Sequence, residues 1–227
     1  MEGSEVAVLI DHTILSPDIT EKDVAVKCQE ALEYNFASVC VNPNYVEFVA
    51  DKLEGSNVKT CTVIGFPLGE STSETKSFAA KNAVKNGADE LDMVINIGAV
   101  KSAAWDVVEA DIKAVVNSVK REDVLVKVIL ETCYLDENEI KQACKAAQSA
   151  GADFVKTSTG FGTHGARVED IEVMKEAVDE EMGIKASGGI HSLEEAVEML
   201  DAGATRIGAS SGVEIVEGVD AVDDGDY

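Results

Sequence analysis

Short β-rich runs alternate with longer stretches of helical periodicity along nearly the whole chain, and this alternation leaves few possible folds. The β-rich runs cover residues 37–41, 59–64, 90–94, 124–130, 154–157, 184–186 and 205–207. An earlier run, residues 6–14, is compatible with either a helix or a strand. Strands that alternate with helices pair in parallel. The sequence therefore predicts about eight strand–helix units around one parallel sheet.

The segments between these runs carry apolar residues on one helical face, as at Ile140 and Cys144. Thr20 and Asp136 are the expected N-caps of two such helices. Most residues of the run 124–130 are apolar on both faces, as a sheet covered by helices requires.

No linker rich in proline or serine divides the 227 residues, a length that suits one barrel of about 250 residues. We therefore expect an α/β protein with a single (β/α)8 TIM-barrel domain over residues 1–213. Residues 214–227 contain six acidic side chains, and we expect them to form an acidic C-terminal tail.

A weak internal repeat places several residues on one rim of the expected barrel. The tripeptide Gly-Ala-x at 87–89, 151–153 and 203–205 ends one helix and opens the next strand, and Asn-Phe-Ala at 35–37 resembles it. Glycine and asparagine both tolerate the left-handed backbone of a helix C-cap. Five positions later we expect the C-terminal ends of the strands, where barrels carry their active sites. The residues at these positions are Cys40, Asp92, Lys156 and Gly208.

Two lysines on consecutive strands are the strongest candidates for chemistry. Lys156 and Lys185 each follow an apolar run and precede a turn rich in serine and glycine. Two ammonium groups in one dry site disfavour each other's charged form, so we expect a lowered lysine pKa. A neutral amine near pH 7 forms a Schiff base with a carbonyl substrate. The alternative is two lysines that extend to solvent at the strand ends.

Asp92 and Lys127 accompany these lysines. A buried aspartate near a lysine is either part of a structural ion pair or a general acid/base, and imine chemistry needs such a proton carrier. Lys127 interrupts an apolar run, where it either points into the barrel toward Asp92 or lies near the hydrated end of its strand.

Three turns of small residues follow the last three strands, at 157–160, 187–189 and 208–212. Barrel loops after the seventh and eighth strands often bind phosphate through backbone amides and hydroxyl groups. A phosphate group is therefore the expected ligand, and ordinary tight turns are the alternative.

Other sites are not predicted. His12, His164 and His191 have no carboxylate or cysteine at ligand spacing, so we expect no metal site, and His12 is more typical of a structural histidine. The chain contains no Walker, G-x-G-x-x-G or G-x-S-x-G motif, which argues against a P-loop, a dinucleotide site and a hydrolase nucleophile elbow.

The charge balance excludes several classes of partner. The chain has 43 acidic and 19 basic residues and a formal net charge of −24. Such a chain repels nucleic acid and anionic lipid. Because 45% of the residues are hydrophobic, disorder does not explain the acidity. We expect a folded protein with a hydrated acidic surface that suits high salt, and therefore a halophilic source.

Five cysteines, an odd number without Cys-x-x-Cys spacing, indicate reduced thiols and a cytoplasmic location. No signal-peptide pattern opens the chain, and no apolar run approaches the roughly 18 residues of a membrane span.

Eight short motifs occur in order over about residues 8–213. They are Asp-His-Thr at 11–13, Ser-Val-Cys-Val-Asn-Pro at 38–43, Gly-Phe-Pro-Leu-Gly at 65–69, Glu-Leu-Asp-Met-Val at 90–94, Lys-Val-Ile-Leu-Glu-Thr at 127–132, Phe-Val-Lys-Thr-Ser-Thr-Gly-Phe at 154–161, Lys-Ala-Ser-Gly-Gly-Ile at 185–190 and Gly-Ala-Ser-Ser at 208–211. Together they resemble the deoxyribose-phosphate aldolase family.

This resemblance implies a class I aldolase without a metal or other cofactor. It would reversibly cleave 2-deoxy-D-ribose 5-phosphate to acetaldehyde and D-glyceraldehyde 3-phosphate. The resemblance implies that Lys156 is the Schiff-base lysine, that Lys185 perturbs it, and that Asp92 is the acid/base working with a water. The residues implied to line the substrate site are Asp11, Thr13, Cys40, Lys127, Thr157, Gly160, Gly188, Gly189, Gly208, Ser210 and Ser211.

The C-terminus departs from the family pattern. Some members place a C-terminal tyrosine over the active site, whereas Tyr227 of this chain follows an aspartate-rich tail. Three other functions are compatible with the residues: another Schiff-base barrel aldolase or transaldolase, a phosphate-binding isomerase without an imine, and a non-catalytic metabolite-binding barrel. The expected partners are small phosphorylated sugars, aldehydes and further copies of the chain in a dimer or tetramer, not nucleic acid or membranes.

Overall fold

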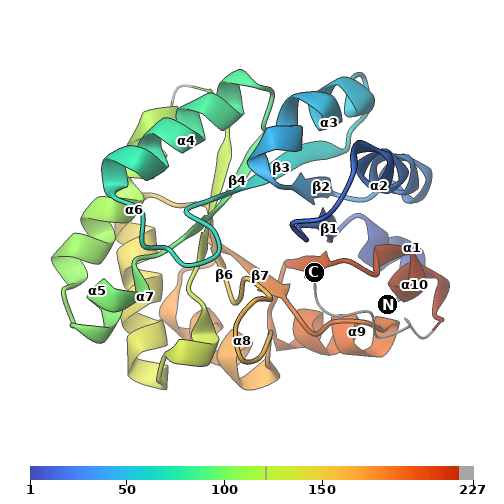
Figure 1. Ribbon diagram of the computed structural model, residues 1–227. Helices are drawn as coiled ribbons and strands as arrows, with labels where there is room; N and C mark the ends of the chain where they lie inside the picture. Colours follow the sequence, from blue (N-terminus) through green and yellow to red (C-terminus); the bar gives the residue numbers. More distant parts are fainter. Residues whose placement is uncertain (121, 220–227) are drawn as a thin grey trace.

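The computed structural model describes residues 1–120 and 122–219 and confirms the predicted (β/α)8 barrel (Figure 1). Eight parallel strands close in chain order, and the last pairs with the first. They are β1 (Ile10–Ile14), β2 (Ser38–Val41), β3 (Lys59–Ile64), β4 (Glu90–Val94), β5 (Leu125–Ile129), β6 (Phe154–Lys156), β7 (Gly183–Ser187) and β8 (Arg206–Ala209).

The helices surround this barrel (Figure 1). They are α1 (Gly3–Ala7), α2 (Glu21–Tyr34), η1 (Pro43–Tyr45), α3 (Val46–Leu53), α4 (Ser73–Lys85), α5 (Ile97–Lys101), α6 (Trp105–Val119), η2 (Thr132–Tyr134), α7 (Glu137–Ala150), α8 (Val168–Ala177), α9 (Leu193–Ala202) and α10 (Gly212–Glu217). The ambiguous run 6–14 holds the end of α1 and the whole of β1, and α1 packs against α10.

The local signals that set the helix ends act as predicted. Thr20 and Asp136 cap α2 and α7, and each takes part in a reciprocal capping box with the residue three positions later. Asn35 and Gly151 adopt the left-handed conformation that ends the same two helices. Gly87 also has a positive φ, of 102°, but it follows the α4 C-cap Asn86.

The apolar core lies between the strands and the helices, and the barrel interior is largely polar. In β4, Leu91 and Met93 belong to the outer core, whereas Glu90 and Asp92 face inward. A small second apolar cluster of Leu15, Cys40, Cys61 and Val63, with Phe66 packed against it, occupies one side of the interior. Alternation along each strand therefore separates the structural core from a polar centre.

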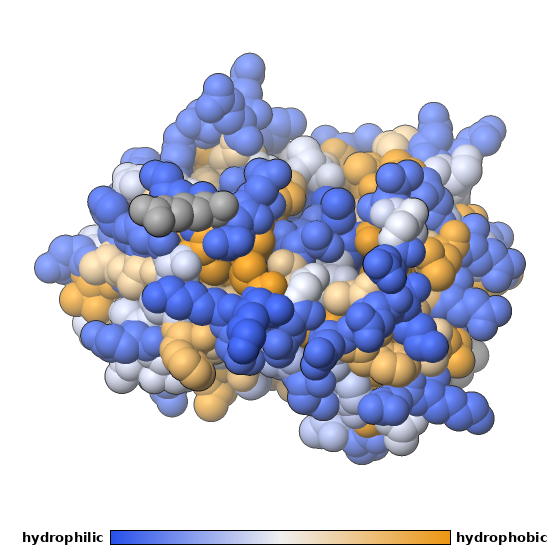
Figure 2. Space-filling view, turned by 90° about the horizontal axis from the view of Figure 1, so that it is seen from above, coloured by the Kyte–Doolittle hydropathy of each residue, from blue (hydrophilic) through white to orange (hydrophobic). Residues whose placement is uncertain are grey.

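The C-terminal boundary is less sharp than the sequence suggested. Helix α10 crosses the expected boundary between residues 213 and 214, and Ile215 is buried in the core. Tyr227 and the other residues of the expected tail beyond 219 lie outside the described residues. In the described part of the chain, no helix combines the length and apolar character needed to cross a membrane. Hydrophilic side chains predominate on the face shown in Figure 2.

Candidate active site

Charged side chains from six strands meet inside the barrel. The strands bring them together because alternate residues of every strand face the axis. The group consists of Asp11 (β1), Glu90 and Asp92 (β4), Lys127 (β5), Lys156 (β6), Lys185 (β7) and Arg206 (β8). The three lysines and three carboxylates are at most 2% exposed. The sequence prediction that Asp92 and the two lysines share one site is consistent with this arrangement.

Asp92 is the centre of the group. Its Oδ2 accepts hydrogen bonds from Lys156 Nζ at 2.8 Å and from Lys185 Nζ at 2.7 Å. Its Oδ1 accepts one from Lys127 Nζ at 2.9 Å. Lys127 therefore points into the barrel toward Asp92, which decides between the two alternatives left by the sequence. Lys156 is the last residue of β6, whereas Asp92 lies in the middle of β4, deeper than the repeat predicted.

Asp11 holds the other side of Lys185, with 2.5 Å between Lys185 Nζ and Asp11 Oδ2. Asp11 Oδ1 accepts hydrogen bonds from Ser38 Oγ at 2.6 Å and from Arg206 Nε at 2.7 Å. The carboxylate is thus tied to β2 and β8, which pair with its own strand, and to β7 beyond β8. Thr13, two residues along the same strand, is also buried, and its hydroxyl donates to the Asp11 carbonyl at 2.9 Å.

The balance of charges fixes the ionisation of the site. Burial alone would raise the pKa of Asp92, but Lys127, Lys156 and Lys185 together hold it well below its ordinary value of 3.8. Burial alone would lower the pKa of Lys185, but the charges of Asp11 and Asp92 raise it well above its ordinary value. The sequence reasoning expected a lowered pKa for a lysine of this pair without saying which; Lys185 is not that lysine, because two carboxylates outweigh the neighbouring ammonium groups.

Two residues of this network were missed by the sequence reasoning. Glu90 Oε2 lies 2.6 Å from Lys127 Nζ, and both of its oxygens accept from Arg206 Nη2 at 2.8 Å. Alternation along the strands could have found them. Glu90 lies two residues before Asp92, and Arg206 two residues before Gly208, so each pair shares one face of its strand. The named group contains four cations and three carboxylates, so it carries a formal excess of positive charge.

Hydrogen bonds join the segment after β6 to the end of β7. Thr157 Oγ1 donates to the Ser187 carbonyl at 3.2 Å and accepts from the Ser187 amide at 3.1 Å. Ser187 Oγ donates to the Ser158 carbonyl at 2.7 Å. Gly160, Gly188 and Gly189 have positive φ values of 88°, 82° and 71°. Among the described residues, no atom lies within 4 Å of the position that a Cβ on Gly189 would occupy.

Gly208 has a different role from a turn glycine. It lies within β8, and a Cβ at this position would come within 2.9 Å of Lys185 Cε. Its missing side chain therefore makes room for the stem of Lys185. Ser210 and Ser211 follow the strand; the Ser210 carbonyl accepts from Lys27 Nζ at 2.9 Å, and Ser211 Oγ donates to the Ile190 carbonyl at 3.4 Å.

Glu131 is a further buried carboxylate that the sequence reasoning left without a role. It is 2% exposed and has a left-handed backbone with φ 57°. Its side chain accepts hydrogen bonds from the Thr159 amide, at 3.1 Å, and from the Thr159 hydroxyl. Positive φ at a residue with a large side chain is strained and persists only where its surroundings require it. Glu131 thus fixes the turn that follows Lys156.

His12 faces the helix layer rather than the barrel interior. It is fully buried, and its Nε2 lies 2.6 Å from Glu30 Oε2 on α2. Its ring also lies against Phe36, with the centroids 4.9 Å apart. The expected structural role is consistent with these contacts.

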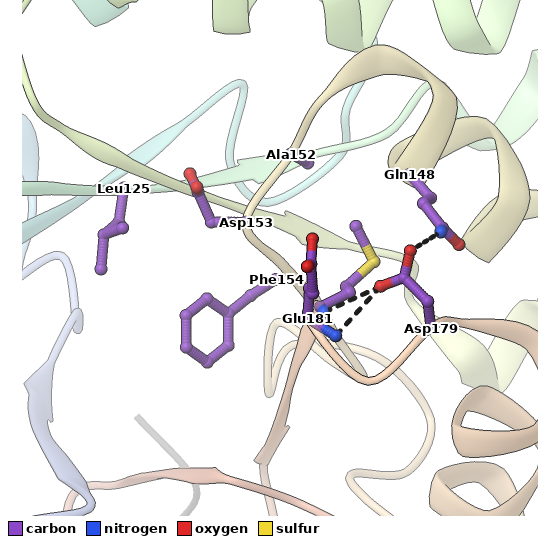
Figure 3. Close-up of a pocket in the computed structure, with 8 residues that line it drawn as sticks. Leu125, Gln148, Ala152, Asp153, Phe154, Asp179 and Glu181 are labelled. Carbon is purple, nitrogen blue, oxygen red and sulfur yellow. Dashed lines mark hydrogen bonds between the residues drawn. The ribbon is translucent and has the colours of Figure 1, made fainter.

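A separate pocket lies at the opposite end of the barrel (Figure 3). Its lining comes from the N-terminal ends of β5, β6 and β7 and includes Leu125, Phe154 and Met182. The carboxylate of Asp179 at its edge accepts from the Glu181 and Met182 amides, each at 3.1 Å, and from the Gln148 side chain. These bonds hold the loop before β7.

Comparison with known proteins gives one consistent result. The model of the DeoC/LacD family aldolases matches residues 5–218. A deoxyribose-phosphate aldolase from Lactococcus lactis subsp. cremoris (strain SK11) is 58% identical over 214 residues, which cover 94% of this chain and 96% of that protein. One from Clostridium tetani (strain Massachusetts / E88) is 56% identical over 213 residues, which cover 94% and 98% respectively.

The solved structures agree with these relatives. A deoxyribose phosphate aldolase from Aeropyrum pernix, described as having a unique tetrameric structure, is 37% identical and superposes with a TM-score of 0.89. The match covers 95% of this chain and 91% of that one.

Proposed function

The chain belongs to the DeoC/LacD family of aldolases, and from this premise we propose that it reversibly cleaves 2-deoxy-D-ribose 5-phosphate to acetaldehyde and D-glyceraldehyde 3-phosphate. The reaction proceeds through a Schiff base on Lys156. One observation carries this proposal: a single carboxylate oxygen of Asp92 accepts hydrogen bonds from the Nζ atoms of both Lys156 and Lys185 inside the barrel.

The proposed reaction begins when the neutral amine of Lys156 attacks the C1 aldehyde of the substrate. Asp92, through a water molecule, assists the loss of hydroxide from the resulting carbinolamine, which gives a protonated imine. Asp92, through the water, removes the proton of the C3 hydroxyl, the C2–C3 bond breaks, and its electron pair moves to the imine to form an enamine. The C3 oxygen becomes the aldehyde oxygen of D-glyceraldehyde 3-phosphate, which leaves. The remaining enamine takes up a proton at carbon, and hydrolysis releases acetaldehyde and regenerates Lys156.

Lys185 supports this chemistry as a permanent cation. Asp11 and Asp92 raise its pKa despite burial, so it stays protonated at neutral pH. A charged ammonium beside Lys156 stabilises negative charge that develops on the substrate oxygen during addition. Lys127, held by Glu90 and Asp92, keeps the acid/base in place.

We also propose that the substrate phosphate binds at the turns after β6, β7 and β8, as the sequence suggested. The turn glycines at 160 and 188, whose missing side chains allow close approach of the backbone, and the serines at 210 and 211 supply amide and hydroxyl donors. Lys27, whose ammonium group reaches the Ser210 carbonyl, adds positive charge near this place.

A coupled cleavage assay tests the function. The purified protein, with excess chelator present, should cleave deoxyribose 5-phosphate, and borohydride with acetaldehyde should leave a reduced adduct on the Lys156 peptide. Full activity with an unmodified Lys156 peptide would contradict the Schiff-base assignment. Faster turnover of fructose phosphates would instead favour another barrel aldolase, and sugar-phosphate isomerisation without borohydride inactivation would favour an isomerase.

Replacing Glu131 by glutamine should lower kcat/KM for deoxyribose 5-phosphate by about tenfold, because the hydrogen bonds from the carboxylate to Thr159 hold the turn after Lys156. Steady-state kinetics of E131Q measure the effect. E33Q, which removes the same charge from an exposed site, serves as the control. Equal kinetics in both variants would show that Glu131 does not position the turn.

We propose that the acidic surface is an adaptation to high salt. A chain with a net charge of −24 repels an anionic phosphate substrate over long distances, and salt screens this repulsion. The KM for deoxyribose 5-phosphate should therefore fall as salt rises from low to molar concentration. Circular dichroism at each salt concentration establishes that the fold is intact. A KM that stays constant or rises would refute the prediction.

We further propose that the protein acts in the cytoplasm and as a homo-oligomer, a dimer or a tetramer. The tetramer named for the Aeropyrum pernix relative and the exposure of Phe78 and Leu68, at 73% and 65%, support self-association. Sedimentation of the native chain distinguishes these states.

A further inference from the structure

Two thiols and the carboxylate of Asp92 form a cluster inside the barrel. The proposed reaction uses Asp92 but neither thiol. Cys40 on β2 and Cys61 on β3 are register partners in the barrel, and both are fully buried. One ligand atom from each of Cys40, Cys61 and Asp92 lies within 4.8 Å of the other two. Cys61 Sγ is 3.3 Å from Asp92 Oδ1.

The dimensions of this cluster suit a tetrahedral ion with sulfur ligands. Metal–sulfur bonds of about 2.3 Å and metal–oxygen bonds of about 2.0–2.2 Å separate the ligand atoms of such an ion by roughly 3.5–3.8 Å. Only small side-chain movements therefore bring the three atoms to coordinating positions. Two thiolates and one carboxylate leave the fourth position for water and favour a soft divalent cation over magnesium or calcium.

The surrounding cations do not oppose this binding as strongly as their number suggests. Each cysteine loses its thiol proton to solvent when it binds the metal, so one divalent ion replaces two protons and the net charge of the interior is unchanged. Lys127 would give up its contact with Asp92 Oδ1, but it keeps Glu90 at 2.6 Å. No buried ammonium is therefore left without a carboxylate.

We propose that Cys40, Cys61 and Asp92 form an inhibitory site for a soft divalent cation such as Zn²⁺ or Cd²⁺. The ion reaches this site by the route that the aldehyde takes to Lys156. A carboxylate bound to the ion no longer accepts protons, so Asp92 stops acting as the acid/base. The site lies beyond the proposed catalytic cycle, in which no metal takes part.

Titration with Cd²⁺ tests the site without reference to activity. One equivalent per chain should produce the ultraviolet charge-transfer band of two cadmium–thiolate bonds. The variant C61S should lose at least half of this band, whereas C133S, which removes a cysteine outside the cluster, should retain it. A band unchanged in C61S, or lost in C133S, would overturn the proposal.

Activity provides a second readout. Saturating Cd²⁺ should lower kcat of the native chain more than tenfold, and a chelator should restore it. Measured against its own rate without cadmium, C61S should be inhibited far less. If C61S does not fold, the native chain still decides the question, because fewer than two thiolates per bound cadmium excludes the site. If the native chain shows the cadmium–thiolate band but no inhibition, cadmium binds in the cluster and the inhibitory effect is refuted. If the native chain shows the band but has no activity even without cadmium, only the proposed function is refuted.

Discussion

Replacing Lys156 by methionine should lower kcat for deoxyribose 5-phosphate cleavage by at least about a thousandfold, the scale on which loss of a covalent nucleophile acts. Methionine retains most of the side-chain volume but has no amine to form the imine. Asp92 keeps Lys127 and Lys185 as partners in this variant, so the fold should survive.

Steady-state kinetics and borohydride trapping measure the effect together. K156M should show neither cleavage nor a reduced adduct, whereas K113M, which removes an exposed lysine from α6, should behave as the native chain. Circular dichroism and thermal unfolding establish that both variants are folded. Retention of the adduct in K156M would move the Schiff base to another lysine, and Lys185 would be examined first.

The second large effect is expected for Asp92→Asn. The substitution is nearly isosteric, but it removes the one carboxylate that three buried lysines share. Loss of the acid/base should lower kcat by about 10²–10⁴-fold. Loss of the buried charge partner should also lower the free energy of unfolding by about 3–5 kcal/mol.

The pH dependence of this stability loss has a definite sign. The pKa of Asp92 in the folded chain lies well below its ordinary value of 3.8, mainly because three lysine charges outweigh burial. Its contribution is therefore fully present above pH 3.8 and is lost as the pH falls toward the folded-state pKa. The difference in unfolding free energy between the native chain and D92N should be constant near neutral pH and shrink below about pH 4.

Urea unfolding from pH 3 to pH 7 measures this difference. D51N, which removes an exposed carboxylate from α3, is the matched control and should differ little from the native chain. If D92N were as stable as the native chain at pH 7, Asp92 would not be the electrostatic centre of the barrel. If its kcat were unchanged, Asp92 would not be the acid/base.

Much of the fold followed from the sequence because its signals are local. Strand–helix alternation, the caps at Thr20 and Asp136, and the left-handed Asn35 and Gly151 depend on residues close together in the chain. Strands 59–64 and 90–94 have their predicted bounds, and the other predicted strands overlap with the observed ones. The ambiguity of residues 6–14 also had a local cause, because a short helix and a strand adjoin there.

The candidate site was only partly predictable. The spacing from the helix caps placed Asp92 and Lys156 toward the C-terminal rim of the barrel. Period-two alternation along the strands would have added Glu90 and Arg206 to the predicted interior charges. The cluster of Cys40, Cys61 and Asp92 gave no spacing signal, because each residue comes from a different strand. Gly208 was interpreted as a turn glycine, but the nearby stem of Lys185 shows that it provides space.

The sequence by itself determined the barrel, the strand order and the residues with the chemistry to react, because periodicity and family motifs are written along the chain. Only the tertiary structure decided which charges neutralise one another. Lys185 shows the reason: the second lysine on the neighbouring strand suggested only mutual repulsion, whereas Asp11 and Asp92, from strands distant in sequence, raise the pKa of Lys185. Electrostatic energies depend on distances through space, and closure of the barrel sets those distances.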